Sequence, residues 1–199
     1  MIQTFAKKEQ HGYNWIDVLD ATAEELTELA SKFQLLDQSV QDSLQPDHLP
    51  KYERLKGYTF SILRVYTPET DTQADSVQEM TDKVSLFVGD DFIVSVHRHP
   101  WAALEVIGKG EANAGACSST HEVYLEIVRA ALQTFEEPGR KLTADIEFYE
   151  KQVFLKDKRK PILKGLYYLK RKVDVVRRIL LLSYDIIDQV DPDDRSTAT

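Results

Sequence analysis

The most regular alternation of apolar and polar positions lies between residues 83 and 97. Apolar residues recur at every second position on both sides of a Gly-Asp-Asp turn: Val84, Leu86 and Val88, then Phe92, Val94 and Val96. This period is typical of two paired β-strands. We expect Gly89 or Asp90 to take the positive φ that a tight hairpin turn needs. Because both faces of residues 92–96 are largely apolar, other parts of the chain should cover both sides of this strand.

Similar alternation predicts strands at residues 1–6, 13–19 and 58–66. Helical spacing separates them. Thr22, followed three residues later by Glu25, has the pattern of a capping box, which predicts a helix over residues 23–33. Asp37 is the predicted cap of a second, shorter helix.

Two long helices are predicted in the last third of the chain. The first should begin with Thr120 as its N-cap, and Pro138 lies inside it. Its apolar seam alternates steps of three and four residues: Leu125, Val128, Leu132, Phe135, Gly139, Leu142, Ile146, Tyr149 and Val153. Because this seam keeps its phase across the proline, we expect one kinked helix rather than two.

The second long helix follows Pro161, which suits a first helical turn. Its seam has the same spacing: Ile162, Leu166, Leu169, Val173, Val176, Leu180, Ser183, Ile187 and Val190. A short turn between the two helices predicts an antiparallel helical hairpin. A second apolar row calls for another helix, from a neighbouring subunit or from sequence outside this chain: Leu163, Tyr167, Ile179, Leu182 and Ile186.

These elements predict an α+β fold with α/β/α-like layers. A mixed sheet flanked by short helices, residues 1–118, is followed by the helical hairpin, residues 119–190. Residues 191–199 lack apolar positions and are expected to form a disordered tail.

Composition places this fold in a globular protein. Of the 199 residues, 42% are hydrophobic and 29% are charged. No run approaches the roughly 20 apolar residues of a membrane span, and residues 1–8 lack the apolar core of a signal peptide. Cys117 is the single cysteine and is expected to be a passive thiol.

Charge is unevenly distributed. Residues 156–178 contain ten basic and two acidic residues, so this segment carries +8 and the remainder −16 of the net −8. Such polarity suits a partner, a membrane surface or a metal ion, although a solvated helix face would look the same. We expect no nucleic-acid partner.

Catalytic signatures are missing. No phosphate-binding glycine loop, cysteine pair or nucleophile elbow is present, so we expect no enzyme. His97 and His99 alternate at a strand end and could hold a transition metal, but no third ligand stands near them in sequence. The loop carboxylates Glu69, Asp71 and Asp75 are most simply solvent-facing. Asp42 and Asp47 flank Pro46 and are candidate ligands for a hard cation such as Mg²⁺, which prefers oxygen and retains waters.

The order of the motifs resembles the cytosolic N-terminal part of a CorA-type magnesium and cobalt transporter. The stretches that carry this resemblance are residues 15–18 with 22–26, 40–44, 50–53 with 58–60, the hairpin 85–97, and the two long helices with Pro138. In that family the cytosolic domain leads into a stalk helix and two membrane spans. The resemblance therefore implies a chain truncated before the stalk, whose missing helix would cover the second apolar row.

The same resemblance implies a function. Members of the family are pentamers of the cell (inner) membrane, and carboxylates between neighbouring cytosolic domains sense Mg²⁺. Asp47, three positions before Pro50, falls where the family can place such a ligand, and Asp42 matches an acidic position of a Leu-Glu-Asp-like motif. A position that is acidic in some relatives is Gln133 or Thr134 here. We thus expect a cytoplasmic regulatory, gating domain with Mg²⁺ as its regulatory ion; the fragment itself could be a monomer.

Two alternatives remain open at this point. One is a zinc transporter of the same fold. The other is a stand-alone scaffold or adaptor whose helical hairpin binds partner helices, which the two unbroken seams would suit.

Overall fold

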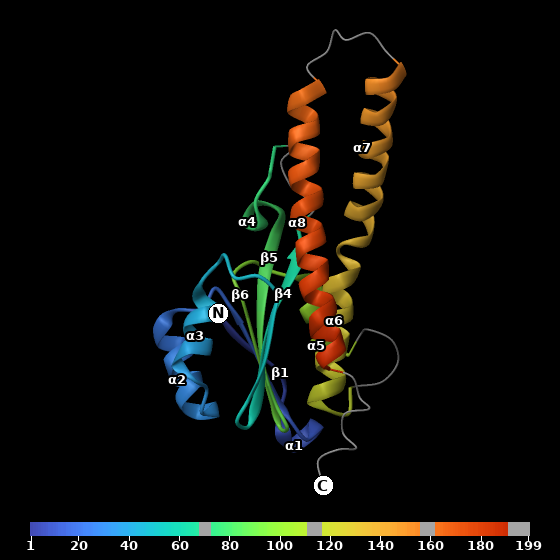
Figure 1. Ribbon diagram of the computed structural model, residues 1–199. Helices are drawn as coiled ribbons and strands as arrows, with labels where there is room; N and C mark the ends of the chain where they lie inside the picture. Colours follow the sequence, from blue (N-terminus) through green and yellow to red (C-terminus); the bar gives the residue numbers. More distant parts are fainter. Residues whose placement is uncertain (68–72, 111–116, 156–161, 191–199) are drawn as a thin grey trace.

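A six-stranded sheet forms the centre of the molecule (Figure 1). The structure is a computed structural model that describes residues 1–67, 73–110, 117–155 and 162–190. The strands are β1 (Ile2–Ala6), β2 (Asn14–Leu19), β3 (Lys51–Leu55), β4 (Tyr58–Tyr66), β5 (Thr81–Gly89) and β6 (Phe92–His97). They are ordered β1-β2-β6-β5-β4-β3, and β2 and β6 run parallel whereas the other neighbours run antiparallel. The predicted mixed sheet is confirmed.

Strand β6 is the most enclosed element, because all six of its residues are buried. Its two faces supply two separate cores. Ile93 contributes to a core with Trp15, Leu86 and helix residues such as Ile127. Val94 and Val96 contribute to the opposite core, with Phe60 and Leu26. The expectation that both sides of this strand are covered is therefore confirmed.

Helices form a layer on each side of the sheet (Figure 1). One layer contains α2 (Ala23–Phe33) and α3 (Asp37–Leu44). The other contains α5 (Ala102–Gly108), α6 (Thr120–Gln133) and the end of α8 (Ile162–Gln189), where Ile186 is buried in the same core as Ile127. Short helices α1 (Lys8–His11) and α4 (Val77–Met80) lie in connections. The α/β/α-like layering is confirmed.

Helix starts agree with the sequence in one case and differ in two. Thr22 and Glu25 form the predicted capping box on α2. Helix α3, in contrast, has Leu36 at its N-cap and no side-chain cap, so Asp37 is its first residue. The Leu36 N–H donates to the Tyr58 hydroxyl at 2.9 Å. Helix α6 is capped by Ser119, whose hydroxyl accepts from the Glu122 N–H, so Thr120 is its first residue.

The first long helix is bent, as expected, but two turn residues divide it into α6 and α7 (Glu136–Leu155). Helix α6 ends at Gln133, and α7 begins at Glu136. There the Phe135 N–H bonds to Leu132 O at 3.0 Å, a tighter i to i−3 turn. The cause is Pro138, which has no N–H to offer Thr134 O. The break places Pro138 in the first turn of α7, where an N–H has no helical partner anyway.

Helices α7 and α8 extend beyond the sheet as the predicted antiparallel pair (Figure 1). The connecting turn, residues 157–160, lies outside the described residues, as does the predicted tail, residues 191–199. Upper seam residues line a shared apolar groove: Ile146, Tyr149, Val153, Leu166, Leu169 and Val173. Gly165 brings the helices close, because a Cβ there would lie 1.8 Å from the Tyr149 hydroxyl.

The lower part of the pair departs from the predicted seams only in part. Leu125, Leu180 and Ile187 are exposed, whereas Val128, Val176 and Ser183 are buried as the seams predict. Helix α6 also buries residues outside its seam: Val123, Tyr124, Ile127 and Ala131. From the second row of α8, Ile179 and Ile186 are buried inside the domain, whereas Leu163 and Tyr167 are exposed. The reason is that the sheet, rather than α7, covers the lower half of α8. The exposed stripe on that half consists of Leu180, Leu181, Tyr184 and Ile187.

Gly89, at the turn between β5 and β6, is required because a larger residue would clash with the Phe92 ring. The residues described with a positive φ are Gly12, Asp20, Gln34, Gly57 and Gly110, so the expectation of a positive φ at Gly89 or Asp90 was wrong. A Cβ on Gly89 would instead lie 2.3 Å from the Phe92 ring. That ring is stacked on Phe33 at a centroid distance of 4.5 Å and has little room to move.

Two glycine substitutions test this packing. Gly89→Ala should lower the free energy of unfolding by about 1–3 kcal/mol through overpacking. Gly139→Ala, in α7 with nothing within 4 Å of the added Cβ, should raise it by about 0.5–1 kcal/mol. Urea unfolding measures both. Equal effects of the two substitutions would contradict the packing described for Gly89.

Candidate functional site

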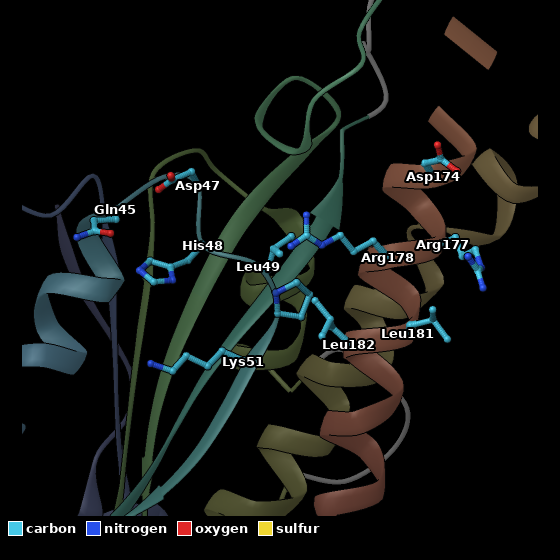
Figure 2. A pocket seen from close by; sticks show the side chains of 11 residues that line it. Gln45, Asp47, His48, Leu49, Lys51, Asp174, Arg177, Arg178, Leu181 and Leu182 are labelled. Carbon is cyan, nitrogen blue, oxygen red and sulfur yellow. The ribbon is translucent and has the colours of Figure 1, made fainter. Parts of the chain in front are cut away.

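A large groove lies between the loop that follows α3 and the middle of α8 (Figure 2). Its volume is about 780 Å³, which lies in the range of ligand sites. Asp47 and His48 lie on the loop side, and Asp174 and Arg178 on the helix side; Arg178 points toward the loop, whereas Arg177 points away (Figure 2). Asp47 is exposed and forms no ion pair with any described residue. The groove therefore presents one free carboxylate on a loop.

Hydrogen bonds from Arg64 of β4, a residue that is only 2% exposed, hold that loop on the sheet. One guanidinium nitrogen donates to Pro46 O at 2.8 Å and His48 O at 3.3 Å, on either side of Asp47. The others donate to the Thr81 hydroxyl, Thr81 O and Val77 O. Burial lowers the pKa of Arg64 to about 10, which still leaves it charged at neutral pH. A buried cation thus holds the backbone that carries Asp47.

Lys83 of β5 fixes the preceding part of the same segment. Its ammonium donates to Asp42 O at 2.7 Å and to Gln45 O, two carbonyls at the end of α3 that lack helical partners. Burial, followed by repulsion from Arg64 and Arg98, lowers the pKa of Lys83 to about 8, against the attraction of Asp42 and Asp47.

The Asp42 carboxylate lies on this segment but is already paired. Lys51 donates to it at 2.7 Å, and His48 Nε2 lies 3.3 Å away. Lys51 also contacts Glu53 at 2.9 Å. Burial lowers the Lys51 pKa, but hydrogen bonds to Asp42 and Glu53 outweigh it and leave the pKa above its ordinary value. Of the two candidate ligands, Asp47 is free and Asp42 is neutralised.

The other candidate ligands are also paired. His97 Nε2 lies 3.1 Å from buried Asp17, whereas His99 contacts Asp82 at 2.7 Å, so the two histidines bind different carboxylates. Among the described residues, no three His, Cys, Asp or Glu side chains gather as a metal site. Asp75 lies 3.6 Å from Arg171, while Glu69 and Asp71 lie outside the described residues.

Thr134 and Cys117, which the sequence analysis also singled out, have structural roles or surroundings that explain them. The Thr134 hydroxyl accepts from the Tyr66 N–H at 2.9 Å and donates to Ala131 O, across the break between α6 and α7. Burial and the neighbouring Glu122 and Glu126 raise the pKa of Cys117, which keeps its thiol protonated, as expected for a passive cysteine.

The buried Asp17–His97 pair was not found by sequence reasoning. Asp17 accepts a hydrogen bond from the Ser95 hydroxyl, which in turn accepts from the Trp15 indole N–H at 3.0 Å. Burial lowers the pKa of His97, but the bonds with Asp17 outweigh it and raise the pKa above its usual value. The one available signal was a charged residue inside an otherwise apolar strand.

Several solved structures share this fold. The full-length CmaX protein matches with a TM-score of 0.72 at 17% identity, over 90% of this chain and 54% of that chain. The complete CorA magnesium transporter from Methanocaldococcus jannaschii gives 0.67 at 15% identity, over 89% and 55%. The cytoplasmic domain of ZntB from Vibrio parahaemolyticus gives 0.67 at 11% identity, over 93% and 73%. The chain therefore spans about half the length of the first two.

The sequence itself matches a family model, "CorA-like Mg2+ transporter protein", over residues 10–196. Because this match covers nearly the whole chain, the protein belongs to the CorA-like family, as its motif order indicated. A comparison with curated proteins finds no significant match.

Within the described parts of the chain, no helix is both long enough and apolar enough to cross a membrane.

Replacement of Arg64 tests the bracing of the loop. Arg64→Met should lower the free energy of unfolding by about 2–4 kcal/mol, because several buried carbonyls lose their donor. Exposed Arg129 on α6 is the control, and Arg129→Met should change stability by less than about 0.5 kcal/mol. Similar small effects for both would show that Arg64 does not hold the loop.

The Asp17–His97 pair predicts a pH dependence. Because the folded-state pKa of His97 is raised, its stabilising contribution is complete below the unfolded pKa of about 6.5 and is lost as pH rises through the folded pKa. The stability difference between the wild type and His97→Asn should therefore be larger near pH 5.5 than near pH 8.5. A difference that grows with pH would contradict this assignment.

Proposed function

We propose that this chain is the cytoplasmic regulatory domain of a divalent-cation transporter, with Mg²⁺ as the transported and sensed ion and Co²⁺ as a second cargo. The observation that carries the proposal is the family match across the sheet, the Asp47 loop and the long helices. The mixed sheet with its helical hairpin, shared with a CorA magnesium transporter, supports it.

Asp47 is the first candidate for the sensing ligand. Its carboxylate is exposed, while Arg64 holds the carbonyls of both neighbouring residues. A fixed backbone with a free carboxylate can bind a hydrated Mg²⁺, which needs few protein oxygens. Because one carboxylate binds such an ion weakly, the remaining ligands would come from a neighbouring subunit.

Asp42 is the second candidate. Its carboxylate can bind a cation only by giving up the ion pair with Lys51. Binding there would release Lys51 toward Glu53. The free carboxylate of Asp47 therefore makes it the stronger candidate of the two.

The exposed stripe on α8 supports a larger assembly. Leu181 and Tyr184 are 55% and 65% exposed. We propose that in the full-length protein a stalk helix covers this stripe and leads to membrane spans in the cell membrane. Homo-oligomers, pentamers by family resemblance, would then bring the Asp47 loops beside neighbouring subunits.

The two alternatives are weaker. Zinc sites usually combine three or four histidine, cysteine or carboxylate ligands, whereas no three such side chains gather among the described residues. The adaptor alternative rested on the two unbroken seams, whose upper residues line a groove shared by α7 and α8. Uptake assays with Mg²⁺ and Zn²⁺ on the full-length protein distinguish the two transporters.

The ligand role of Asp47 can be tested in the full-length protein. Millimolar Mg²⁺ should raise its melting temperature, and Asp47→Asn should weaken the apparent affinity about tenfold, because one charged ligand is lost. The control is Asp90→Asn, in the exposed turn between β5 and β6, at the end of β5 opposite to Lys83, which should leave the affinity unchanged. Unchanged affinity in the Asp47 variant would remove this residue from the site.

A further inference from the structure

A second, smaller cavity lies on the other side of the Asp47 loop. Its volume is about 170 Å³, and it opens where the parallel strands β2 and β6 end. Ser43, Leu44 and Pro46 line it, whereas Gln45, Asp47 and His48 line the larger groove. The same short segment therefore separates the two spaces.

The wall of this cavity is rich in cations. Arg64, Lys83 and Arg98 line it together, and none of the three forms an ion pair with a carboxylate among the described residues. Arg64 and Lys83 donate to backbone carbonyls and a hydroxyl, which satisfy their hydrogen bonds without an ion pair. Asp82 and Asp47 attract Arg64, and Asp42 and Asp47 attract Lys83, without an ion-pair contact. Uncompensated charge that is removed from water is unfavourable.

Acidic groups at the cavity offset these cations only in part. Asp82 lines it, attracts Arg64 and contacts His99 at 2.7 Å, while His97 is paired with Asp17. Asp20 lines it as well and is exposed. Repulsion among the three cations contributes to the lowered pKa of Lys83, which is about 8.

We propose that this cavity binds a small tetrahedral oxyanion, a phosphate or the phosphoryl group of a phosphomonoester. Lys83 uses two of its three ammonium hydrogens on carbonyls, so one remains for the anion. Exposed Arg98 supplies the adjustable guanidinium that can close over it. The volume is suited to a free anion or a phosphoryl group rather than to a whole nucleotide.

The anion would also influence the opposite side of the loop. Since Asp42 and Asp47 interact with Lys83 electrostatically, a bound anion would offset the positive potential that opposes a cation at Asp47. This coupling rests on the proposed cation-sensing function, but the anion site itself does not.

The test is isothermal titration of the present chain with inorganic phosphate and, separately, with AMP, at constant ionic strength set with chloride. Saturable binding of phosphate supports a free anion as ligand, and tighter binding of AMP supports a phosphomonoester. Arg98→Glu should weaken binding about tenfold or more, because an attractive charge becomes repulsive. Arg129→Glu, an equal charge change on the exposed face of α6, is the matched control.

Three results would overturn the proposal: no saturable heat with either anion, equal binding by the two variants, or an effect that chloride alone reproduces. Circular dichroism checks that Arg98→Glu is folded. We expect a folded variant, because Arg98 is exposed and contributes to neither core. In a second step, phosphate should increase the Mg²⁺ affinity of the full-length protein. Phosphate binding without this increase would leave the anion site in place and contradict only the coupling.

Discussion

The buried guanidinium of Arg64 is the interaction on which the arrangement of the candidate site depends. It lies on β4, a central strand, and donates to carbonyls of the 46–48 loop, of α4 and of β5. A neutral side chain could not satisfy so many acceptors at once. The guanidinium therefore joins β4 to two segments that are distant in sequence, residues 46–48 and 77–81, and its charge lies in the wall of the smaller cavity. Lys83 extends this role to the end of α3.

The sheet and the helical hairpin play different parts around this centre. The sheet has a complete core on each face, so it provides a rigid base for the loop. Helix α6 and the lower half of α8 pack on that base, whereas α7 and the upper half of α8 project beyond it (Figure 1). Because Asp174 and Arg178 lie on α8 opposite Asp47, a movement of this helix would alter the groove directly (Figure 2). The geometry thus places the Asp47 loop, proposed here as a cation site, beside the longest helix that the structure describes.

Much of the fold could be predicted from the sequence, because its signals are local. The β5–β6 hairpin, β4 and the Thr22 capping box follow from period-2 alternation and cap chemistry within a few residues. The kink near Pro138 was predicted, but the two turn residues before α7 were not, because an apolar seam that keeps its phase carries no information about lost backbone hydrogen bonds. Which α8 residues are buried depends on the sheet beneath it, and no local pattern contains that information. The site was predicted only in part for the same reason: Asp42 and Asp47 were identified, but Arg64, Lys83 and Asp17 act through contacts with distant segments. An arginine inside a confident strand was the available signal for the first of these.

The central claim is that the braced Asp47 loop belongs to a cation-sensing domain of a divalent-cation transporter. Mg²⁺ flux through the full-length protein in proteoliposomes, measured against the Mg²⁺ concentration on the side of this domain, tests it most directly. The account predicts a flux that falls as Mg²⁺ on that side rises through the millimolar range. A protein that carries no divalent-cation flux, or a flux that does not respond to Mg²⁺ on that side, would contradict it.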